Sequence, residues 1–201
     1  MGGGGFRAEA VSYIDENGET QNTTGTVTEW NSSTTNFSLS GGWYYVTGTV
    51  NANGDITLPN SGTVNLILGD GFTLTATKID GFASLVIYGQ SAGTGTLKIE
   101  NSSEALIQSR RGVTINGGNI NISSENGSAY INSIGVTISG GQVTVTGQGS
   151  NPGIICASGK SITLGYTNTD DFIQASGYYN YSSNSYTAAT PKIADGKIFV
   201  N

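Results

Sequence analysis

Residues Gly112-Val113-Thr114-Ile115-Asn116-Gly117-Gly118-Asn119-Ile120-Asn121-Ile122 recur 23 positions later as Gly135-Val136-Thr137-Ile138-Ser139-Gly140-Gly141-Gln142-Val143-Thr144-Val145. Each copy has apolar residues at alternate positions on both sides of a Gly-Gly pair, which is the pattern of two short β-strands joined by a turn. Weaker copies lie at Val64–Gly69, Ser84–Gly89 and Ser161–Gly165. The chain is therefore built from repeated short strands.

A third short apolar stretch closes each turn of the repeat, at Ala105–Ile107, Tyr130–Ile131 and Ile154–Cys156. Strands related by one translation stack in parallel register, each above its predecessor. The pattern thus predicts an all-β fold, a right-handed parallel β-helix (solenoid), with Val113 stacked between Leu85 and Val136. The alternative is a β-sandwich or meander, because two-residue glycine turns also join antiparallel strands.

Both ends of the repeated region have the character of caps, which solenoids need because open strand edges pair with other chains. Val11–Gln21 contains an Asn-Gly turn and predicts an N-terminal hairpin cap, whereas Asp170–Tyr186 leaves the repeat and is rich in tyrosine. We expect one β-helix domain over residues 11–201, with an N-terminal cap at 11–45, coils at 46–168 and an irregular C-terminal cap at 169–201. The glycine-rich residues 1–10 predict a flexible tether, with an upstream export signal or lipid anchor removed.

The composition argues against several classes of protein. Charged residues make up 11% of the chain, the formal net charge is −6, and no basic run exceeds Arg110-Arg111, so neither nucleic acid nor an anionic membrane is an expected partner. No apolar stretch approaches the roughly 20 residues that span a bilayer. The chain has no histidine, and its single cysteine, Cys156, lies in an apolar run that predicts burial. We therefore expect no metal site and no cofactor.

Several segments resemble a group of secreted β-helix proteins from gut anaerobes that are often labelled carbohydrate-binding domain-containing. The resemblance covers residues 11 to 173 and rests on Tyr13–Gln21, Gly42–Val46, Val64–Gly71, Ile87–Ser91 and Leu164–Asn168. It implies a β-helix fold and export from the cell.

Many pectin-active enzymes are parallel β-helices, and Asn168–Asp171 contains the Asn-Thr-Asp triplet and the Asp pair of polygalacturonases. Those enzymes also carry a Gly-His-Gly element, which this chain lacks. Glycoside hydrolysis needs two carboxylates around one bond, whereas adjacent Asp170 and Asp171 on a strand point to opposite faces.

Two further sets of charged residues are expected to have structural rather than catalytic roles. Glu100 and Glu104 flank a Ser-Ser turn that we expect to be a solvated loop. Asp80 falls near Arg110 when one coil is overlaid on the next, which favours an ion pair over a lyase site, because calcium takes 6 to 8 oxygen ligands. We predict no catalytic residues.

Aromatic side chains are the remaining candidates for binding, since sugars stack on the rings of Trp and Tyr. Strand alternation places Trp43 and Tyr45 on one face and Tyr44 on the other. A second aromatic group lies near the C-terminus. These rings either plug the ends of the helix or form a glycan platform, whose residues would be Trp43, Tyr45, Tyr178, Tyr179, Tyr181 and Tyr186.

We therefore expect a non-catalytic module that is extracellular or attached to a bacterial cell surface and binds a polysaccharide or host glycan. The first alternative is a structural or adhesive surface protein that makes protein contacts. The second is a polysaccharide lyase or glycoside hydrolase.

Overall fold

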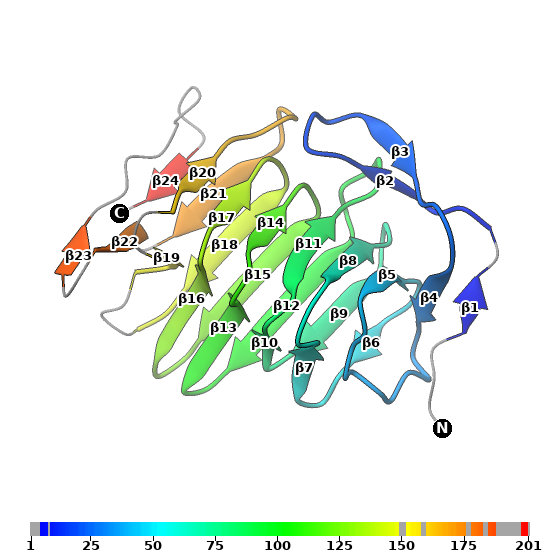
Figure 1. The fold of residues 1–201 in the computed structure, drawn as a ribbon, viewed down its shortest axis with the longest axis horizontal. Helices are drawn as coiled ribbons and strands as arrows, with labels where there is room; N and C mark the ends of the chain where they lie inside the picture. Colours follow the sequence, from blue (N-terminus) through cyan, green and yellow to red (C-terminus); the bar gives the residue numbers. More distant parts are fainter. Residues whose placement is uncertain are drawn as a thin grey trace.

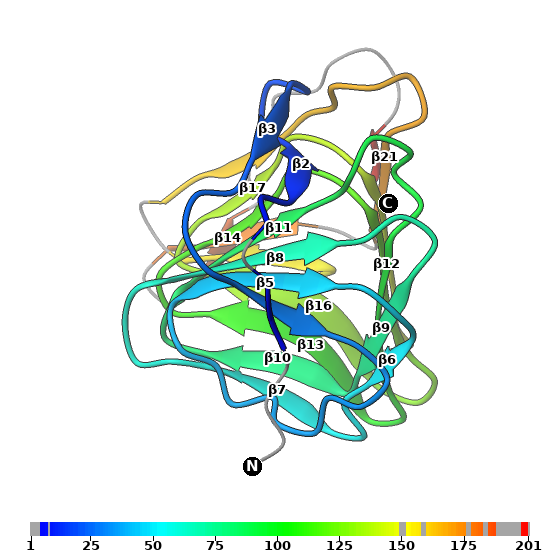
Figure 2. The same cartoon turned by 90° about the vertical axis from the view of Figure 1, so that its right-hand side faces the viewer.

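A computed structural model describes residues 5–7, 9–148, 152–157, 160–175, 178–182, 185–187 and 198–200, with the side chains of these residues up to 175 apart from Arg7. All regular structure in this part of the chain is β-strand (Figure 1). Three long sheets wind around one core as a parallel β-helix of about five turns (Figure 2).

From β5 to β22, each turn contributes one strand to each sheet, in a fixed order. Sheet 1 contains β1 (Phe6–Arg7), β4 (Val27–Trp30), β5 (Gly42–Val46), β8 (Thr63–Leu68), β11 (Ser84–Tyr88), β14 (Val113–Ile115), β17 (Val136–Ile138) and β20 (Ile162–Leu164). Sheet 2 contains β6 (Val50–Asn51), β9 (Thr73–Ala76), β12 (Thr96–Asn101), β15 (Asn119–Ser124), β18 (Gln142–Thr146), β21 (Phe172–Ala175) and β24 (Ile198–Val200). Sheet 3 contains β7 (Asp55–Leu58), β10 (Lys78–Gly81), β13 (Glu104–Ser109), β16 (Ser128–Ser133), β19 (Ile154–Cys156), β22 (Tyr178–Ser182) and β23 (Ser185–Thr187).

The strand register confirms the 23-residue repeat. Val113 pairs in parallel with Leu85 on one side and Val136 on the other, and Ile120 pairs with Val143 in the next sheet. Parallel pairing between successive turns rules out the antiparallel sandwich or meander.

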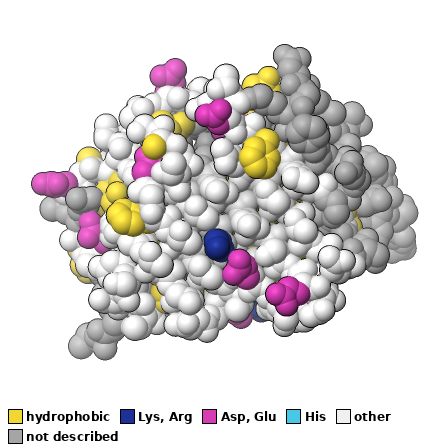
Figure 3. Space-filling model, turned by 180° about the vertical axis from the view of Figure 1, so that it is seen from behind, with side chains coloured by type: hydrophobic (Ala, Val, Ile, Leu, Met, Phe, Trp, Pro, Cys, Tyr) yellow, Lys and Arg dark blue, Asp and Glu magenta, His cyan; other side chains and the backbone are white. Residues whose placement is uncertain are grey.

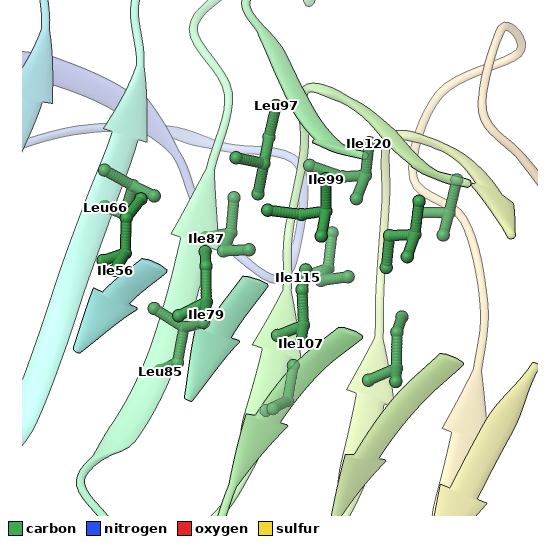
Figure 4. Packing of buried hydrophobic residues seen from close by; sticks show 14 of the residues in the cluster. Ile56, Leu66, Ile79, Leu85, Ile87, Leu97, Ile99, Ile107, Ile115 and Ile120 are labelled. Carbon is green, nitrogen blue, oxygen red and sulfur yellow. The ribbon is translucent and has the colours of Figure 1, made fainter. Parts of the chain in front are cut away.

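The core is a set of aliphatic rows that run along the solenoid. In sheet 1 the row Leu66, Ile87, Ile115 and Ile138 follows the register, and each of these side chains is at most 2% exposed. Figure 4 shows these rows meeting those of the other two sheets in the interior. Burying each such side chain contributes roughly 1.5–3 kcal/mol, so the repeated aliphatic positions supply the main driving force for the fold.

The coils extend into both segments that were expected to be caps. Strands β4 and β5, within the expected cap at 11–45, pair in parallel with each other, and β5 pairs with β8. Strands β21 and β22, within the expected cap at 169–201, pair in parallel with β18 and β19. Strands of the coils thus lie outside the expected limits of 46 and 168, because Trp30, Ile173 and Ala175 continue the inward apolar positions despite their weak match to the repeat.

The expected tether also contributes structure. Strand β1 pairs antiparallel with β4, and the Glu29 N–H donates to the Gly5 carbonyl at 2.7 Å. The described residues 5–7 therefore form an edge strand of sheet 1.

Aromatic side chains fill the first turn of the core. The ring of Trp30 lies 5.1 Å from that of Phe37 and 5.2 Å from that of Tyr44, and all three are buried. The Tyr44 hydroxyl donates to the Ser40 carbonyl at 3.0 Å, so its polar end is satisfied. These three rings plug the N-terminal end of the core.

The predicted hairpin forms, but it lies along the side of the solenoid. Strands β2 (Ser12–Ile14) and β3 (Thr20–Asn22) pair antiparallel around the Asn17-Gly18 turn. The Ile14 N–H donates to the Gly89 carbonyl at 3.0 Å, which places the hairpin beside the loop after β11 (Figures 1 and 2). The sequence suggested that the hairpin covers the end of the β-helix. The hairpin instead lies along the side and forms one wall of a groove.

Candidate functional site

A groove of about 330 Å³ lies between the hairpin and the loops that lead from sheet 1 to sheet 2. The hairpin provides Ile14, Gly18 and Thr20. Four successive loops provide the other walls and the floor, through Gly89–Gly93, Asn116–Gly118, Gly141–Gln142, Thr167–Asn168 and Asp170–Asp171. The lining is predominantly polar, and the volume is near the lower end of the range for small-molecule sites.

Outward aromatic side chains hold the hairpin on sheet 1. The ring of Tyr13 lies 5.0 Å from that of Trp43 and 4.6 Å from that of Tyr88. Beneath them, Ile67 points outward from β8 and is nevertheless fully buried. The hairpin thus covers an apolar patch on the outer face of sheet 1.

The Gln90 side chain also holds the hairpin on sheet 1, through hydrogen bonds. Its side-chain N–H donates to the Ser12 carbonyl at 2.9 Å, and its side-chain oxygen accepts from the Asp70 N–H at 3.1 Å and from the Tyr45 hydroxyl at 3.3 Å. One side chain therefore links the hairpin, β5 and two successive loops.

Asp15 organises the turn of the hairpin. Its carboxylate accepts hydrogen bonds from the Asn17 and Glu19 N–H groups and from the Gln21 amide, at 2.9–3.0 Å. The hydrogen bond from the Glu19 N–H is the largest cause of the lowered pKa of Asp15; desolvation opposes it, and the bonds from Asn17 and Gln21 lower the pKa further. The turn that faces the groove is therefore ordered by an ionised carboxylate.

Backbone atoms of glycine residues form much of the floor of the groove. The loops are so close together there that a Cβ atom would not fit. Gly118 and Gly141 occupy the same position in successive turns, with φ of +87° and +91°. A Cβ at Gly141 would lie 2.6 Å from the Gly118 carbonyl oxygen. The Gly-Gly pairs that read as turns in the sequence therefore also keep the loops close together under the groove.

Asn116 places an unsatisfied polar group at this floor. The residue is 3% exposed, lines the groove, and its backbone N–H donates to the Ile87 carbonyl at 2.8 Å. Its side-chain oxygen Oδ1 is buried and has no hydrogen-bond partner within the described structure. Leaving a buried acceptor unpaired costs about 1–3 kcal/mol, so this amide is a functional candidate.

The acidic rim of the groove is partly structural. Asp171 Oδ2 accepts the Thr167 and Asn168 N–H groups at 2.9 and 2.8 Å. Asp171 thus shapes the loop after β20, whereas the neighbouring Asp170 side chain is exposed on the rim. Among the described residues, no basic side chain lines the groove, which suits a neutral polar ligand.

The structure separates the aromatic candidates that the sequence grouped together. Trp43 and Tyr45 project outward from β5, opposite to Tyr44 as predicted, but both are partly buried against the hairpin. Tyr178, Tyr179 and Tyr181 belong to β22 and Tyr186 to β23, and their side chains lie outside the described residues. Sequence reasoning did not single out Asn116, Gln90 or Gln142; for Asn116 and Gln142 the available signal was their position beside a Gly-Gly pair.

The other groups considered in the sequence also have defined surroundings. Cys156 is buried, as predicted, and burial raises the pKa of its thiol. Arg110 does not pair with Asp80 but lies over the Phe82 ring, 5.0 Å from its centroid. Register explains the error, because Asp80 pairs with Gln108, two positions before Arg110.

Glu104 has a defined partner as well. It accepts a hydrogen bond from the Tyr130 hydroxyl at 2.5 Å, one strand further along sheet 3. This side chain is therefore engaged across neighbouring strands on the outer face of the sheet.

The outer surface of the solenoid is polar with few charges. The face seen from behind shows mostly uncharged polar side chains and backbone, with scattered acidic and hydrophobic side chains and, near the centre, a basic side chain beside an acidic one (Figure 3). Within the described part of the chain, no cluster of three His, Cys, Asp or Glu side chains is placed to hold a metal. Nor does that part contain a helix of the length and apolarity needed to cross a membrane.

These features define a parallel β-helix with a hairpin that forms one wall of a polar lateral groove. In comparisons with known proteins, no family model, no curated sequence and no solved structure matches this chain. The functional argument therefore rests on the residues of the groove.

Proposed function

We propose that this protein is a non-catalytic carbohydrate-binding β-helix, exported to the exterior or surface of a bacterial cell, and that the groove beside the hairpin binds a neutral glycan segment. The observation that carries the proposal is the buried, unpartnered Oδ1 of Asn116 at the floor of a polar groove. A sugar hydroxyl that donates to this oxygen would relieve the cost of leaving it unpaired.

The remaining lining supports a sugar over other small ligands. Sugars present many hydroxyl groups, and the amides of Gln142 and Asn168, the Thr20 hydroxyl and the Asp170 carboxylate supply donors and acceptors around the groove. The absence of basic side chains from the described part of the lining disfavours phosphorylated ligands at this position.

Affinity gel electrophoresis with a panel of neutral polysaccharides tests the proposal. We expect retardation of the wild-type protein by at least one polysaccharide and its loss in Asn116→Ala and Asp170→Ala. Asn121→Ala is the matched control, because Asn121 lies on the outer face of sheet 2 and does not line the groove. Failure of every polysaccharide to retard the wild type would contradict glycan binding.

The same gels distinguish the groove from the aromatic platform. If Tyr179→Ala abolishes retardation while Asn116→Ala does not, the glycan binds at the C-terminal aromatic group. Trp43→Ala is expected to act indirectly, because Trp43 supports the hairpin.

A further inference from the structure

A second pocket, of about 280 Å³, lies at the corner where sheet 3 leads into sheet 1. Its polar lining comes from adjacent turns and includes Gln108, Arg110, Asn132 and Ser133, while Ile134 and Ala157 provide apolar contact. Gln108 pairs with Asn132 in the register of β13 and β16, so their side chains project outward side by side. We call this site the Ser133 pocket.

Ser133 is buried in this pocket without a hydrogen-bond partner. It is 4% exposed, and its Oγ has no partner within the described structure. Ser109, which occupies the same position one turn earlier, donates to the Ala83 carbonyl at 2.6 Å and accepts from the Arg111 and Gly112 N–H groups at 3.1 Å.

Loop length accounts for the difference between the two serines. Three residues connect β13 to β14, but only Ile134 and Gly135 connect β16 to β17. In the longer connection the N–H groups of Arg111 and Gly112 donate to Ser109 Oγ. The shorter connection has one N–H group fewer. Ser133 is therefore left with a buried, unpartnered hydroxyl at the wall of the pocket.

Three other side chains of the pocket can donate hydrogen bonds, although the carboxamides of Gln108 and Asn132 also carry an acceptor oxygen each. Arg110 carries five N–H donors, and the guanidinium of this exposed side chain lies 5.0 Å from the centroid of the Phe82 ring. The carboxamides of Gln108 and Asn132 each add two N–H donors. No carboxylate of the described residues lines the pocket, and Asp80, which pairs with Gln108 in register, lines a separate pocket with Phe82.

From this arrangement we propose that the Ser133 pocket binds an oxyanion, either the carboxylate or the sulfate group of a small polar ligand. Arg110 neutralises the charge through its guanidinium, and the Ser133 hydroxyl donates one hydrogen bond from the pocket wall. Gln108 and Asn132 complete the set of donors, while Ile134 and Ala157 contact the body of the ligand. This site is separate from the groove and does not depend on the function proposed there.

Binding is tested with sodium sulfate and sodium galacturonate, with neutral galactose as the uncharged comparison, at ionic strength held constant with sodium chloride. Amide chemical shifts in the full chain report the position of binding, and calorimetry reports the affinity. We expect sulfate or galacturonate to shift the amides of Ser133 and Ile134, and galactose not to shift them. A response to sulfate alone identifies a sulfate ester as the ligand group, whereas a response to galacturonate alone identifies a carboxylate.

Arg110→Gln is expected to weaken binding about tenfold or more, because charged hydrogen bonds are worth roughly 1.5–3 kcal/mol. Ser133→Ala should weaken binding about two- to tenfold, the range for a neutral hydrogen bond. Arg111→Gln is the matched control, since Arg111 is the next residue, is exposed and does not line the pocket.

Equal weakening by Arg111→Gln and Arg110→Gln would mean diffuse attraction to surface charge and would overturn the proposal. So would an absence of shifts at Ser133 with both anions. Asn116→Ala, which alters only the groove, should leave oxyanion binding unchanged, so the two sites fail independently.

Discussion

The ring of Tyr13 lies 4.6 Å from the ring of Tyr88, and this contact fastens an N-terminal hairpin to the side of a β-helix. Tyr13 also lies 5.0 Å from Trp43, and each aromatic pair contributes about 0.5–1.5 kcal/mol beyond the burial of its area. Tyr13→Ala should therefore loosen the hairpin at a cost of roughly 1–3 kcal/mol. We expect the fluorescence of Trp43 to shift to the red and proteolysis to occur near residues 15–19.

Phe6→Ala is the control for this change, because Phe6 is 79% exposed. If Tyr13→Ala gives the same fluorescence and cleavage pattern as Phe6→Ala, the aromatic contact does not hold the hairpin in place.

The hairpin should also affect the titration of Tyr88. Desolvation by burial, followed by the effects of Tyr13, Glu16 and Asp15, raises the pKa of Tyr88 from 10.0 to about 12. Because the folded-state pKa is the higher one, the corresponding stabilisation is present below pH 10 and is lost as the pH rises from about 10 to about 12. The ultraviolet absorbance of tyrosinate measures this pKa, which should fall toward 10 in Tyr13→Ala.

Chemical denaturation across the same pH range supplies the second measurement. Tyr88→Phe should lose less stability than the wild type between pH 10 and pH 12. An equal loss in the two proteins would assign the pH dependence to other groups.

The aliphatic core should respond strongly to truncation. Ile115 is fully buried between Ile87 and Ile138, so Ile115→Ala should lower the free energy of unfolding by about 2–5 kcal/mol. Thr114→Ala, on the outer face of the same strand, should change it by about 0.5 kcal/mol or less. Similar values for the two variants in urea denaturation would be incompatible with the described register.

The glycine floor should not tolerate a side chain. Gly141→Ala combines φ of +91° with a Cβ only 2.6 Å from the Gly118 carbonyl oxygen. We expect a loss of about 1–2 kcal/mol from the backbone conformation alone, with a further loss from the clash. At Gly54 a Cβ meets nothing within 4 Å, so Gly54→Ala should be neutral or stabilising by up to about 1 kcal/mol in thermal denaturation.

Much of the fold was predictable because the repeat and its register are local properties of the sequence. Alternating apolar residues around Val113 and Val136 specify both the strands and their parallel stacking. The ends of the solenoid were harder to predict, since strands such as β4 and β21 need only one or two inward apolar residues and show little of the repeat.

The lateral position of the hairpin could not be predicted from its own residues. It depends on an apolar patch that appears only when β5, β8 and β11 are adjacent. One signal was present in β8, where Ile67 breaks the alternation set by Asn65 on the outer face. The groove and the Ser133 pocket could not be predicted from the sequence for a related reason, because each is formed by loops from several turns.

The span of the hairpin sets a limit on how this protein can change in length. Near its base Tyr13 contacts Trp43 in β5, and at its tip Gly18 packs against Thr167, where an added Cβ would lie 3.0 Å from the threonine Cβ. In a simple solenoid, an additional repeat lengthens the molecule without disturbing the others. Here a 23-residue duplication between β8 and β20 would move Thr167 one strand spacing away, about 4.8 Å, while the hairpin stayed the same length. The fixed length of the hairpin thus limits the number of turns that it can span. Duplication or loss of a repeat must be accompanied by a change in the length of the hairpin.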